Sequence, residues 1–498
     1  MAEQIAVRPI RSFDFFTISK GVGFMELERN TERWAEQVFG GCELGDVRRT
    51  RRLMTMAAQL AAHAGEAPSR ACRGDAAANE GAYRLLRNKA VAPEAIAAGG
   101  FRATAQAAQT CGGDMLAVED TTTLAYAHSV AEELGDLGGR EQSQQRGWFA
   151  HSVLLLEADS GRTLGLMEQE RWCRPVAQRG QRHRRRERAY TEKESYKWQR
   201  AGERVAARLD AETLQRVIAV CDREADVYEY LQYKRAEGQR FIVRACWDRR
   251  VAAEAQHLFE TLATGPVIGE QTLRLAQRGG THGRRARQVV LELHAARVTL
   301  QAPRRAPGLG TLEVNAVLAQ ERDTPRRVEP LCWLLLTSEP VDSREAVCRV
   351  LRYYALRWRV EEFHKAWKSG ARVEERRMQS VENLERTAVV LAFIAVRLLQ
   401  LRELFDTPAV AVAETPPPLS CAGVLEQVEW QVLWVTQKRS RPPKEPPSLR
   451  WAYEAIAKLG GWLDTKRTGR AGWEAIWEGW FRLQERVDAY VATRDFLH

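Results

Sequence analysis

The stretch QRVIAVCDREADVYEYLQYKRAEGQRFIVRA, residues Gln215–Ala245, decides the fold class. VIAVC is a continuous apolar run, which is typical of a central strand covered on both faces. VYEYLQYKR has helical periodicity, and RFIVRA is again strand-like. A strand, a helix and a second strand in this order are typical of a sheet with helices packed on it. The stretch therefore predicts an α/β fold in which Asp222 follows the end of a buried strand.

More strands are predicted on both sides of this unit. Before it, the strand candidates are MLAVED (115–120), GWFAHSVLLLEA (147–158) and RTLGLMEQERW (162–172), with a hairpin signal at ADSGR between the last two. After it, VVLELHAARVTL (289–300) is predicted to be a pair of strands and LCWLLLTS (331–338) another strand. Three strands in a row followed by alternation of helix and strand predict a mixed sheet.

Helical patterns precede and follow the predicted sheet. Asp46 can cap a helix VRRTRRLMTMAAQLAAHAG (47–65), and two long helices are predicted at 346–368 and 382–405. The whole pattern predicts a series of regions, namely an extension at 1–24, a helical domain at 25–95, an α/β region at 96–245, a mostly β region at 246–339, helices at 340–408 and a helical domain at 409–498.

The composition favours a protein that binds a polyanion. The 498 residues carry a formal net charge of +10, and nucleic acid is the commonest polyanionic partner of basic proteins. Nine cysteines without a CxxC or Cys/His cluster predict reduced thiols in a cytoplasmic protein and argue against a zinc site. The longest apolar run, TAVVLAFIAV (387–396), is too short to span a bilayer, so no membrane partner is expected.

One predicted helix sorts its charges onto one face. Tyr354, Arg357, Glu361, Lys365 and Lys368 follow one another at spacings of 3, 4, 4 and 3, which places all five on the same side of a helix. A carboxylate flanked by cations stays ionised, which suits a metal ligand or a component of an anion site. The alternative is an ordinary salt-bridged helix, because such pairs are common and each contributes only tenths of a kcal/mol.

A metal site would need partners for Glu361. Hard cations take several oxygen ligands, usually carboxylates from different elements. Asp120 ends the strand MLAVED, and Asp222 follows VIAVC, at the position where α/β sheets place their sites. For Asp222 the alternative is a helix cap, because VYEYLQYKR follows closely. Arg48, Arg49, Arg51 and Arg52 crowd the first turns of the 47–65 helix and oppose its dipole, so either a bound anion or solvent must compensate them.

The chain resembles insertion-sequence transposases of the IS-four type, which belong to the DDE class. The spacing Tyr354-x-x-Arg357-x-x-x-Glu361-x6-Lys368 matches the signature of that family. The likeness runs from about Leu27 nearly to the end through LGDVRRTRRL, NEGAYRLLRN, VEDTTTLAY, VAEELGDLG, RGWFAHSVLLLEA, VIAVCDREAD, WLLLTSEP, RWRVEEFHKAWKSGA, AVRLLQLRE, LRWAYEAIAKLGG and WEGW.

The resemblance implies a fold and an active site. The fold would be a ribonuclease-H-like mixed-sheet catalytic core with a β-rich insertion, flanked by N-terminal and C-terminal helical domains. Asp120, Asp222 and Glu361 would form the catalytic triad and hold two Mg²⁺ ions, for which Mn²⁺ would substitute. Such ions lie about 3.5–4 Å apart in two-metal sites.

The resemblance also implies DNA contacts and partners. Tyr354, Arg357, Lys365, Lys368 and Arg244 would lie near the phosphates of a transposon end. Trp333 would stack on a base that is flipped out during hairpin formation, although composition alone favours a core tryptophan there. The helix with Arg48, Arg49 and Arg52 would read the inverted repeat, and the C-terminal helices would form a homodimer. The partners would be transposon-end double-stranded DNA and target DNA, in the cytoplasm of a bacterium.

Two alternative functions stay open, and two segments depart from the family. The chain could be a catalytically inactive DNA-binding regulator of transposition, or a metal-dependent nuclease without a joining step. The segment Arg179–Arg188 is strongly basic where the family is acidic, and residues before Met25 have no family counterpart, so Met25 is a second candidate start.

Overall fold

The structure is a computed structural model. It describes residues 28, 30–137, 145–174, 188–252, 257–275, 287–304, 306–324, 328, 330–405, 420–465 and 471–497. The predicted extension at 1–24 and the basic segment 179–188, apart from Arg188, lie outside the described residues. The chain divides into two compact units, one containing Thr104–Glu362 and the other containing Thr17–Ala103 with Phe363–His498.

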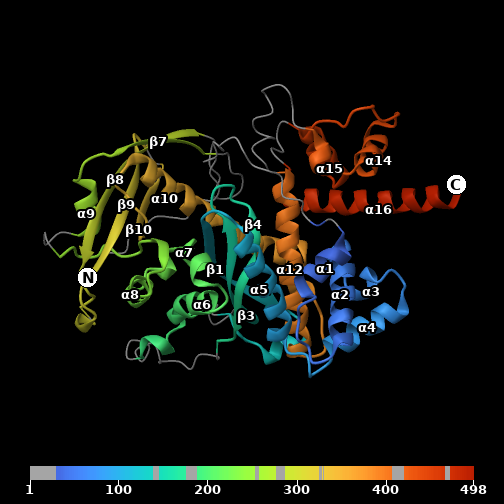
Figure 1. Cartoon of the computed structure of the whole chain (residues 1–498), viewed down its shortest axis with the longest axis horizontal. Coiled ribbons are helices and arrows are strands. Elements are labelled where there is room, and N and C mark those ends of the chain that lie inside the picture. Colours follow the sequence, from blue (N-terminus) through green and yellow to red (C-terminus); the bar gives the residue numbers. More distant parts are fainter. Residues whose placement is uncertain are drawn as a thin grey trace. The chain divides into compact units, whose positions relative to one another are not determined.

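The first unit is built on one mixed sheet (Figure 1). Its strands are β1 Met115–Tyr126, β2 Gly135–Asp136, β3 Arg146–Glu157, β4 Thr163–Trp172, β5 Val217–Cys221, β6 Arg240–Arg244, β7 Gly269–Leu275, β8 Arg287–Leu300, β9 Leu312–Arg322 and β10 Cys332–Thr337. β3 pairs antiparallel with both β4 and β1, and β1, β5 and β6 are parallel neighbours. This order, β4-β3-β1-β5-β6, is that of a ribonuclease-H-like core, as predicted.

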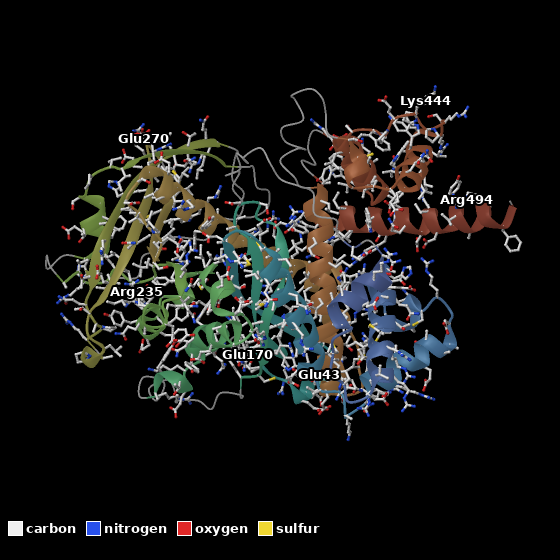
Figure 2. The ribbon with its side chains drawn as sticks, viewed as in Figure 1. Glu43, Glu170, Arg235, Glu270, Lys444 and Arg494 are labelled. Carbon is white, nitrogen blue, oxygen red and sulfur yellow. The ribbon has the colours of Figure 1, made fainter. Side chains whose placement is uncertain are left out.

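The strands of the predicted insertion extend the same sheet. β10 pairs antiparallel with β6, and β9, β8 and β7 follow in turn. The prediction of two strands at 289–300 is wrong, because these residues belong to the single strand β8. β7 and β9 flank β8 and supply hydrogen-bond partners on both sides, which keeps the weak strand formers HAAR extended. The edge strand β7 carries charge, including Glu270, which pairs with Arg322 (Figure 2).

Helices of the first unit cover the sheet and bury its apolar side chains. They are α6 Lys197–Ala206, α7 Ala211–Gln215, α8 Tyr228–Ala236, α9 Leu258–Ala263 and α10 Arg344–Leu356. Trp198 of α6 and Tyr228 of α8 share one core with the odd-numbered residues Cys221 of β5 and Phe241 of β6. Even-numbered residues of β5 face the other side, where α10 contacts this strand.

The second unit is helical. It contains α1 Thr31–Phe39, α2 Val47–Ala62, α3 Pro68–Ala71, α4 Ala76–Leu86, α12 Val381–Phe405, α14 Gln427–Lys438, α15 Leu449–Leu459 and α16 Trp473–Leu497. Asp46 caps α2 as predicted, by accepting a hydrogen bond from the backbone N–H of Arg48. α16 is a long helix beside α14 and α15, and Arg494 lies near its C-terminal end (Figures 1 and 2). Gly479 allows α16 to approach α15, because a Cβ there would lie 1.8 Å from the carbonyl oxygen of Ile456.

Helix α12 is a core helix rather than a membrane span. Its residues Ala388–Ala395 are all buried, and Phe393 packs edge-on against Phe39 of α1. Arg386 donates hydrogen bonds to the carbonyl oxygens of Leu86 and Val91, which ties α12 to the end of α4. Among the described residues, no helix combines the length and apolarity that crossing a bilayer requires. The helix α5, Pro93–Thr110, crosses the predicted boundary at residue 95.

Candidate active site

Two neighbouring parallel strands bring Asp120 and Asp222 together. β1 and β5 pair in parallel from Met115↔Val217 to Val118↔Val220. Two residues further along this register come Asp120 in β1 and Asp222 directly after β5. Both carboxylates lie on the even-numbered side of the strands, opposite the core that contains Cys221. The parallel register therefore places the two carboxylates beside one another at this edge of the sheet.

Arg357 links Asp120 to Glu361. Helix α10 ends at Leu356, Arg357 occupies the break, and α11 runs over Trp358–Lys365. One guanidinium nitrogen of Arg357 donates to Asp120 Oδ2 at 3.2 Å and the other donates to Glu361 Oε1 at 2.6 Å. The Arg357 side chain is only 9% exposed, against 20% for Asp120 and 25% for Glu361. Arg357 thus bridges Glu361, four residues further along the chain, and Asp120, 237 residues before it.

The site has more negative than positive charge. Burial raises the pKa of Asp222, the Asp120 carboxylate raises it further, and Arg357 lowers it. Burial also lowers the pKa of Arg357, but the surrounding groups, including all three acids, outweigh burial and hold this pKa above its ordinary value. Asp120, Asp222 and Glu361 thus surround a single guanidinium. Three ionised carboxylates beside one guanidinium carry two more negative charges than positive ones, and one divalent cation would neutralise them.

The donor set fits a hard cation. All three candidate ligands are carboxylates, and Mg²⁺ prefers oxygen ligands. Within the described residues, no three His, Cys, Asp or Glu side chains are grouped closely enough to hold a metal ion together. At these three acids, the Arg357 guanidinium stands between Asp120 and Glu361. A cation bound by all three would therefore have to replace this guanidinium or share the carboxylates with it.

Comparison with protein families gives two matches along the chain. A transposase DNA-binding family matches residues 31–91, which cover α1 to α4. A transposase DDE domain matches residues 178–397, which include Asp222 and Glu361. The chain therefore carries a transposase DNA-binding domain and a transposase DDE domain. The DDE-domain match begins after Asp120, and the β1–β5 pairing brings this residue beside Asp222.

The charge-sorted segment is not one regular helix. The prediction of a single helix over 346–368 is wrong, because α10 ends at Leu356, α11 begins at Trp358 and a π-helical turn, Ala366–Gly370, follows α11. Arg357 and Glu361 still pair across one turn, as the predicted spacing requires. Lys368 lies 3.7 Å from Glu374, and Lys365 is the last residue of α11.

Three residues predicted to contact DNA form a buried cluster. The ring of Tyr354 packs edge-on against Trp333 with 5.2 Å between the centroids, and Arg244 hydrogen bonds to Tyr354. Arg244 also donates to the carbonyl oxygen of Cys332 at 3.3 Å. Trp333 is 5% exposed and Tyr354 6%. Trp333 is therefore a buried core tryptophan here, as composition alone favours, and its ring packs against Tyr354.

The arginines of α2 divide into two groups. Arg49 donates to the carbonyl oxygen of Leu44 at 2.8 Å, so its guanidinium is held by its own domain. Arg48 pairs with the cap residue Asp46, whose carboxylate neutralises part of the positive charge at the start of α2. Arg48, Arg51 and Arg52 line a pocket of about 260 Å³ between α2 and α4. Arg51 thus lines the same pocket as Arg48 and Arg52, which were predicted to contact DNA. The third predicted contact, Arg49, does not line this pocket.

Other acids near the site have structural partners. Asp226 is fully buried, pairs with Arg249 and accepts hydrogen bonds from the backbone N–H groups of Cys246 and Trp247 at 2.7 and 2.9 Å. The predicted alternative, in which Asp222 caps the helix VYEYLQYKR, is wrong, because Val227 occupies the N-cap position of α8. Asp222 Oδ1 instead accepts a hydrogen bond from the backbone N–H of Glu224 and caps the short turn Arg223–Ala225.

Sequence reasoning missed a buried network beneath Asp120. His151 lies 3.3 Å from Glu119 through one ring nitrogen and 3.0 Å from the Thr121 hydroxyl through the other. The backbone N–H of Thr121 in turn donates to Asp120 Oδ1 at 2.7 Å. The antiparallel register Thr121↔His151 could have revealed the network, but single-sequence patterns do not give strand register.

Proposed function

We propose that the chain is a cut-and-paste DNA transposase of the IS-four type, similar to the transposase of transposon Tn-five. It binds the inverted repeats at the element ends, cleaves through a hairpin intermediate and joins the 3′ ends to target DNA by two-metal phosphoryl transfer. The convergence of Asp120, Asp222 and Glu361 on Arg357, in a chain that also carries a transposase DNA-binding domain, is the observation that supports this proposal.

Asp120, Asp222 and Glu361 would hold the Mg²⁺ ions of this reaction. Two such ions activate an attacking hydroxyl and stabilise the leaving oxygen at a scissile phosphate. The buried network of Glu119 and His151 fixes the strand position of Asp120 through Thr121. Because the ligands stand on a paired strand, a strand end and a helix, their backbone positions are set before DNA arrives.

The cations and aromatics around the acids would hold the DNA end. In the proposal, Arg357 exchanges its carboxylates for phosphate oxygens, with which a guanidinium forms two parallel hydrogen bonds. Lys365, Lys368, Tyr354 and Arg244 would contact neighbouring phosphates. Trp333 would receive a flipped base only after the Tyr354 ring moves away from it.

The helical regions would supply end recognition and assembly. The pocket between α2 and α4, with Arg48, Arg51 and Arg52, would take phosphates of the inverted repeat. Helices within residues 409–498 would join two protomers, so that each holds one end and cleavage awaits pairing of the ends. In this proposal the protein works on chromosomal DNA in the bacterial cytoplasm.

The test is to analyse the DNA products. Purified protein is incubated with Mg²⁺, a DNA fragment bounded by the sequences that flank its own gene, and a target plasmid, with Glu361→Gln as the control. The proposal expects hairpin ends on denaturing gels and joined products in the plasmid, both absent with the variant. Binding without cleavage would instead indicate a regulator, and cleavage without hairpins or joining would indicate a nuclease.

A further inference from the structure

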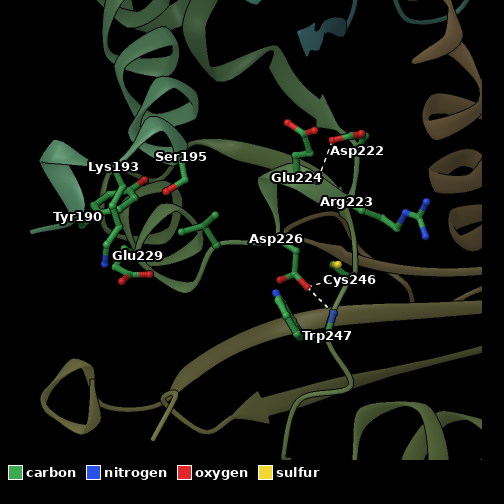
Figure 3. Close-up of a pocket in the computed structure, with 11 residues that line it drawn as sticks. Tyr190, Lys193, Ser195, Asp222, Arg223, Glu224, Asp226, Glu229, Cys246 and Trp247 are labelled. Atoms are coloured by element: carbon green, nitrogen blue, oxygen red, sulfur yellow. Dashed lines mark hydrogen bonds between the residues drawn. The ribbon is translucent and has the colours of Figure 1, made fainter. Parts of the chain in front are cut away.

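A pocket of about 520 Å³ opens beside Asp222, within the first unit. Tyr190, Lys193 and Glu229 lie on one side of it, and Asp222 with Glu224 lies on another (Figure 3). The volume is in the range of small-molecule sites, which is about 300–1,000 Å³. Asp222 belongs both to this pocket and to the three acids around Arg357. Whatever fills the pocket therefore lies next to the reacting phosphate of the proposed function.

Trp247 forms an exposed aromatic wall of this pocket. It is 41% exposed, one of the few large apolar side chains of the described residues that face solvent. Its backbone is nevertheless rigid, because its N–H and that of Cys246 both donate to the buried Asp226. Asp226 is itself held by Arg249. A fixed loop that presents an indole to solvent beside a polar cavity has the properties of a stacking platform.

The polar groups of the pocket suit the edge of a base. Asp222, Glu224 and Glu229 line it together with Lys193 and Arg223, and Glu224 also pairs with Lys197 at 3.1 Å. Figure 3 shows Arg223 directed away from Tyr190 and Lys193. Carboxylates accept hydrogen bonds from the exocyclic amino groups of bases and repel phosphate oxygens. The Tyr190 hydroxyl is buried and has no hydrogen-bond partner among the described residues, so it can serve a ligand.

We propose that this pocket binds one unpaired nucleobase of the DNA held at the three acids, with Trp247 stacked on its face. The proposal rests on the proposed function, because it takes DNA as the ligand. The base enters the pocket while its phosphates stay outside the acidic wall. The site is distinct from Trp333, whose ring is 5% exposed and packs against Tyr354.

The experiment uses the full chain in EDTA, so that DNA binding is measured without cleavage. The probes are duplexes with the sequence of the DNA that flanks the gene. Each duplex carries one unpaired 2-aminopurine, and its position moves by one nucleotide from one duplex to the next. Stacking of 2-aminopurine on an indole quenches its fluorescence. At one or a few adjacent positions, we expect quenching and an affinity about tenfold above that for the fully paired duplex, which corresponds to about 1.4 kcal/mol and is typical of one stacked base.

Three variants separate this site from its alternatives. Trp247→Ala should abolish both the quenching and the affinity difference, Trp247→Phe should keep the affinity difference, and Trp333→Ala should keep both. Equal loss of affinity for paired and unpaired duplexes in Trp247→Ala, or quenching that depends on Trp333 alone, would overturn the proposal. The same follows if bound duplexes show no quenching at any position. Failure to bind any duplex would instead refute the proposed function itself.

Discussion

Arg357 is predicted to compete with divalent cations for Asp120 and Glu361. Its guanidinium donates to both carboxylates, at 3.2 and 2.6 Å, and its side chain is 9% exposed. Replacing it by glutamine, Arg357→Gln, removes the positive charge that bridges these two acids and leaves their charges and that of Asp222 to repel one another. The variant should therefore bind Mn²⁺ or Mg²⁺ more tightly than the wild type when no DNA is present.

The size of the effect follows from the burial of the pair. Removing one partner of a buried ion pair costs about 3–5 kcal/mol. Because Asp120 and Glu361 are 20% and 25% exposed, solvent screens them and the low end applies. A cation that restores the lost charge recovers about 3 kcal/mol, which corresponds to roughly a 100-fold gain in affinity.

Isothermal titration calorimetry on the DNA-free protein measures this affinity directly. The matched control is Arg359→Gln, because Arg359 pairs at 2.9 Å with the neighbouring Glu362 and should not affect cation binding. Arg357→Lys keeps the positive charge and should fall between the wild type and Arg357→Gln, and circular dichroism checks that each variant is folded. Equal or weaker cation binding by a folded Arg357→Gln protein would refute the reasoning.

Three further predictions concern residues outside this pair. Asp226→Asn should lower the free energy of unfolding of its unit by about 3 kcal/mol in urea denaturation, because it breaks the ion pair between the fully buried Asp226 and Arg249. Arg51→Gln should reduce the salt dependence of DNA binding by about one unit of slope, whereas Arg49→Gln should leave that slope unchanged and cost about 1 kcal/mol of stability through the lost hydrogen bond. Burial raises the pKa of Cys42 to about 12, so this thiol stays protonated at pH 8, and mass spectrometry after brief iodoacetamide treatment of the native protein should find Cys42 unmodified and the exposed Cys173 alkylated.

Local patterns were sufficient to predict the sheet core. The apolar run Val217–Cys221 is strand β5 with the predicted bounds, and Asp46 begins α2 as its capping chemistry requires. These features depend on residues close in sequence. The 289–300 segment was misread because its extension depends on two neighbouring strands that a local window does not include.

The candidate site was less accessible to sequence reasoning. Helical spacing led to Glu361, but no periodicity reveals that the helix breaks at Arg357 or that a π turn follows α11. The strand-end positions of Asp120 and Asp222 indicated both acids, but the pairing of Arg357 with Asp120 joins distant parts of the chain and no local pattern predicts it. Trp247 carries no sequence signal, because its exposure depends on the buried hydrogen bonds that Asp226 makes to its loop.

The central claim is that Asp120, Asp222 and Glu361 act together on DNA that other parts of the chain hold. The most direct test is the single-turnover rate of cleavage of end DNA with Mg²⁺ for Asp120→Asn, Asp222→Asn and Glu361→Gln, with DNA affinity measured in parallel. Glu362→Gln is the control, because Glu362 pairs with Arg359 rather than with Arg357. We expect each of the three variants to lose cleavage by at least about 10³-fold while DNA affinity stays within a few-fold, as for members of one catalytic unit. Wild-type cleavage by any of the three, or equal loss in the Glu362→Gln control, would contradict the account.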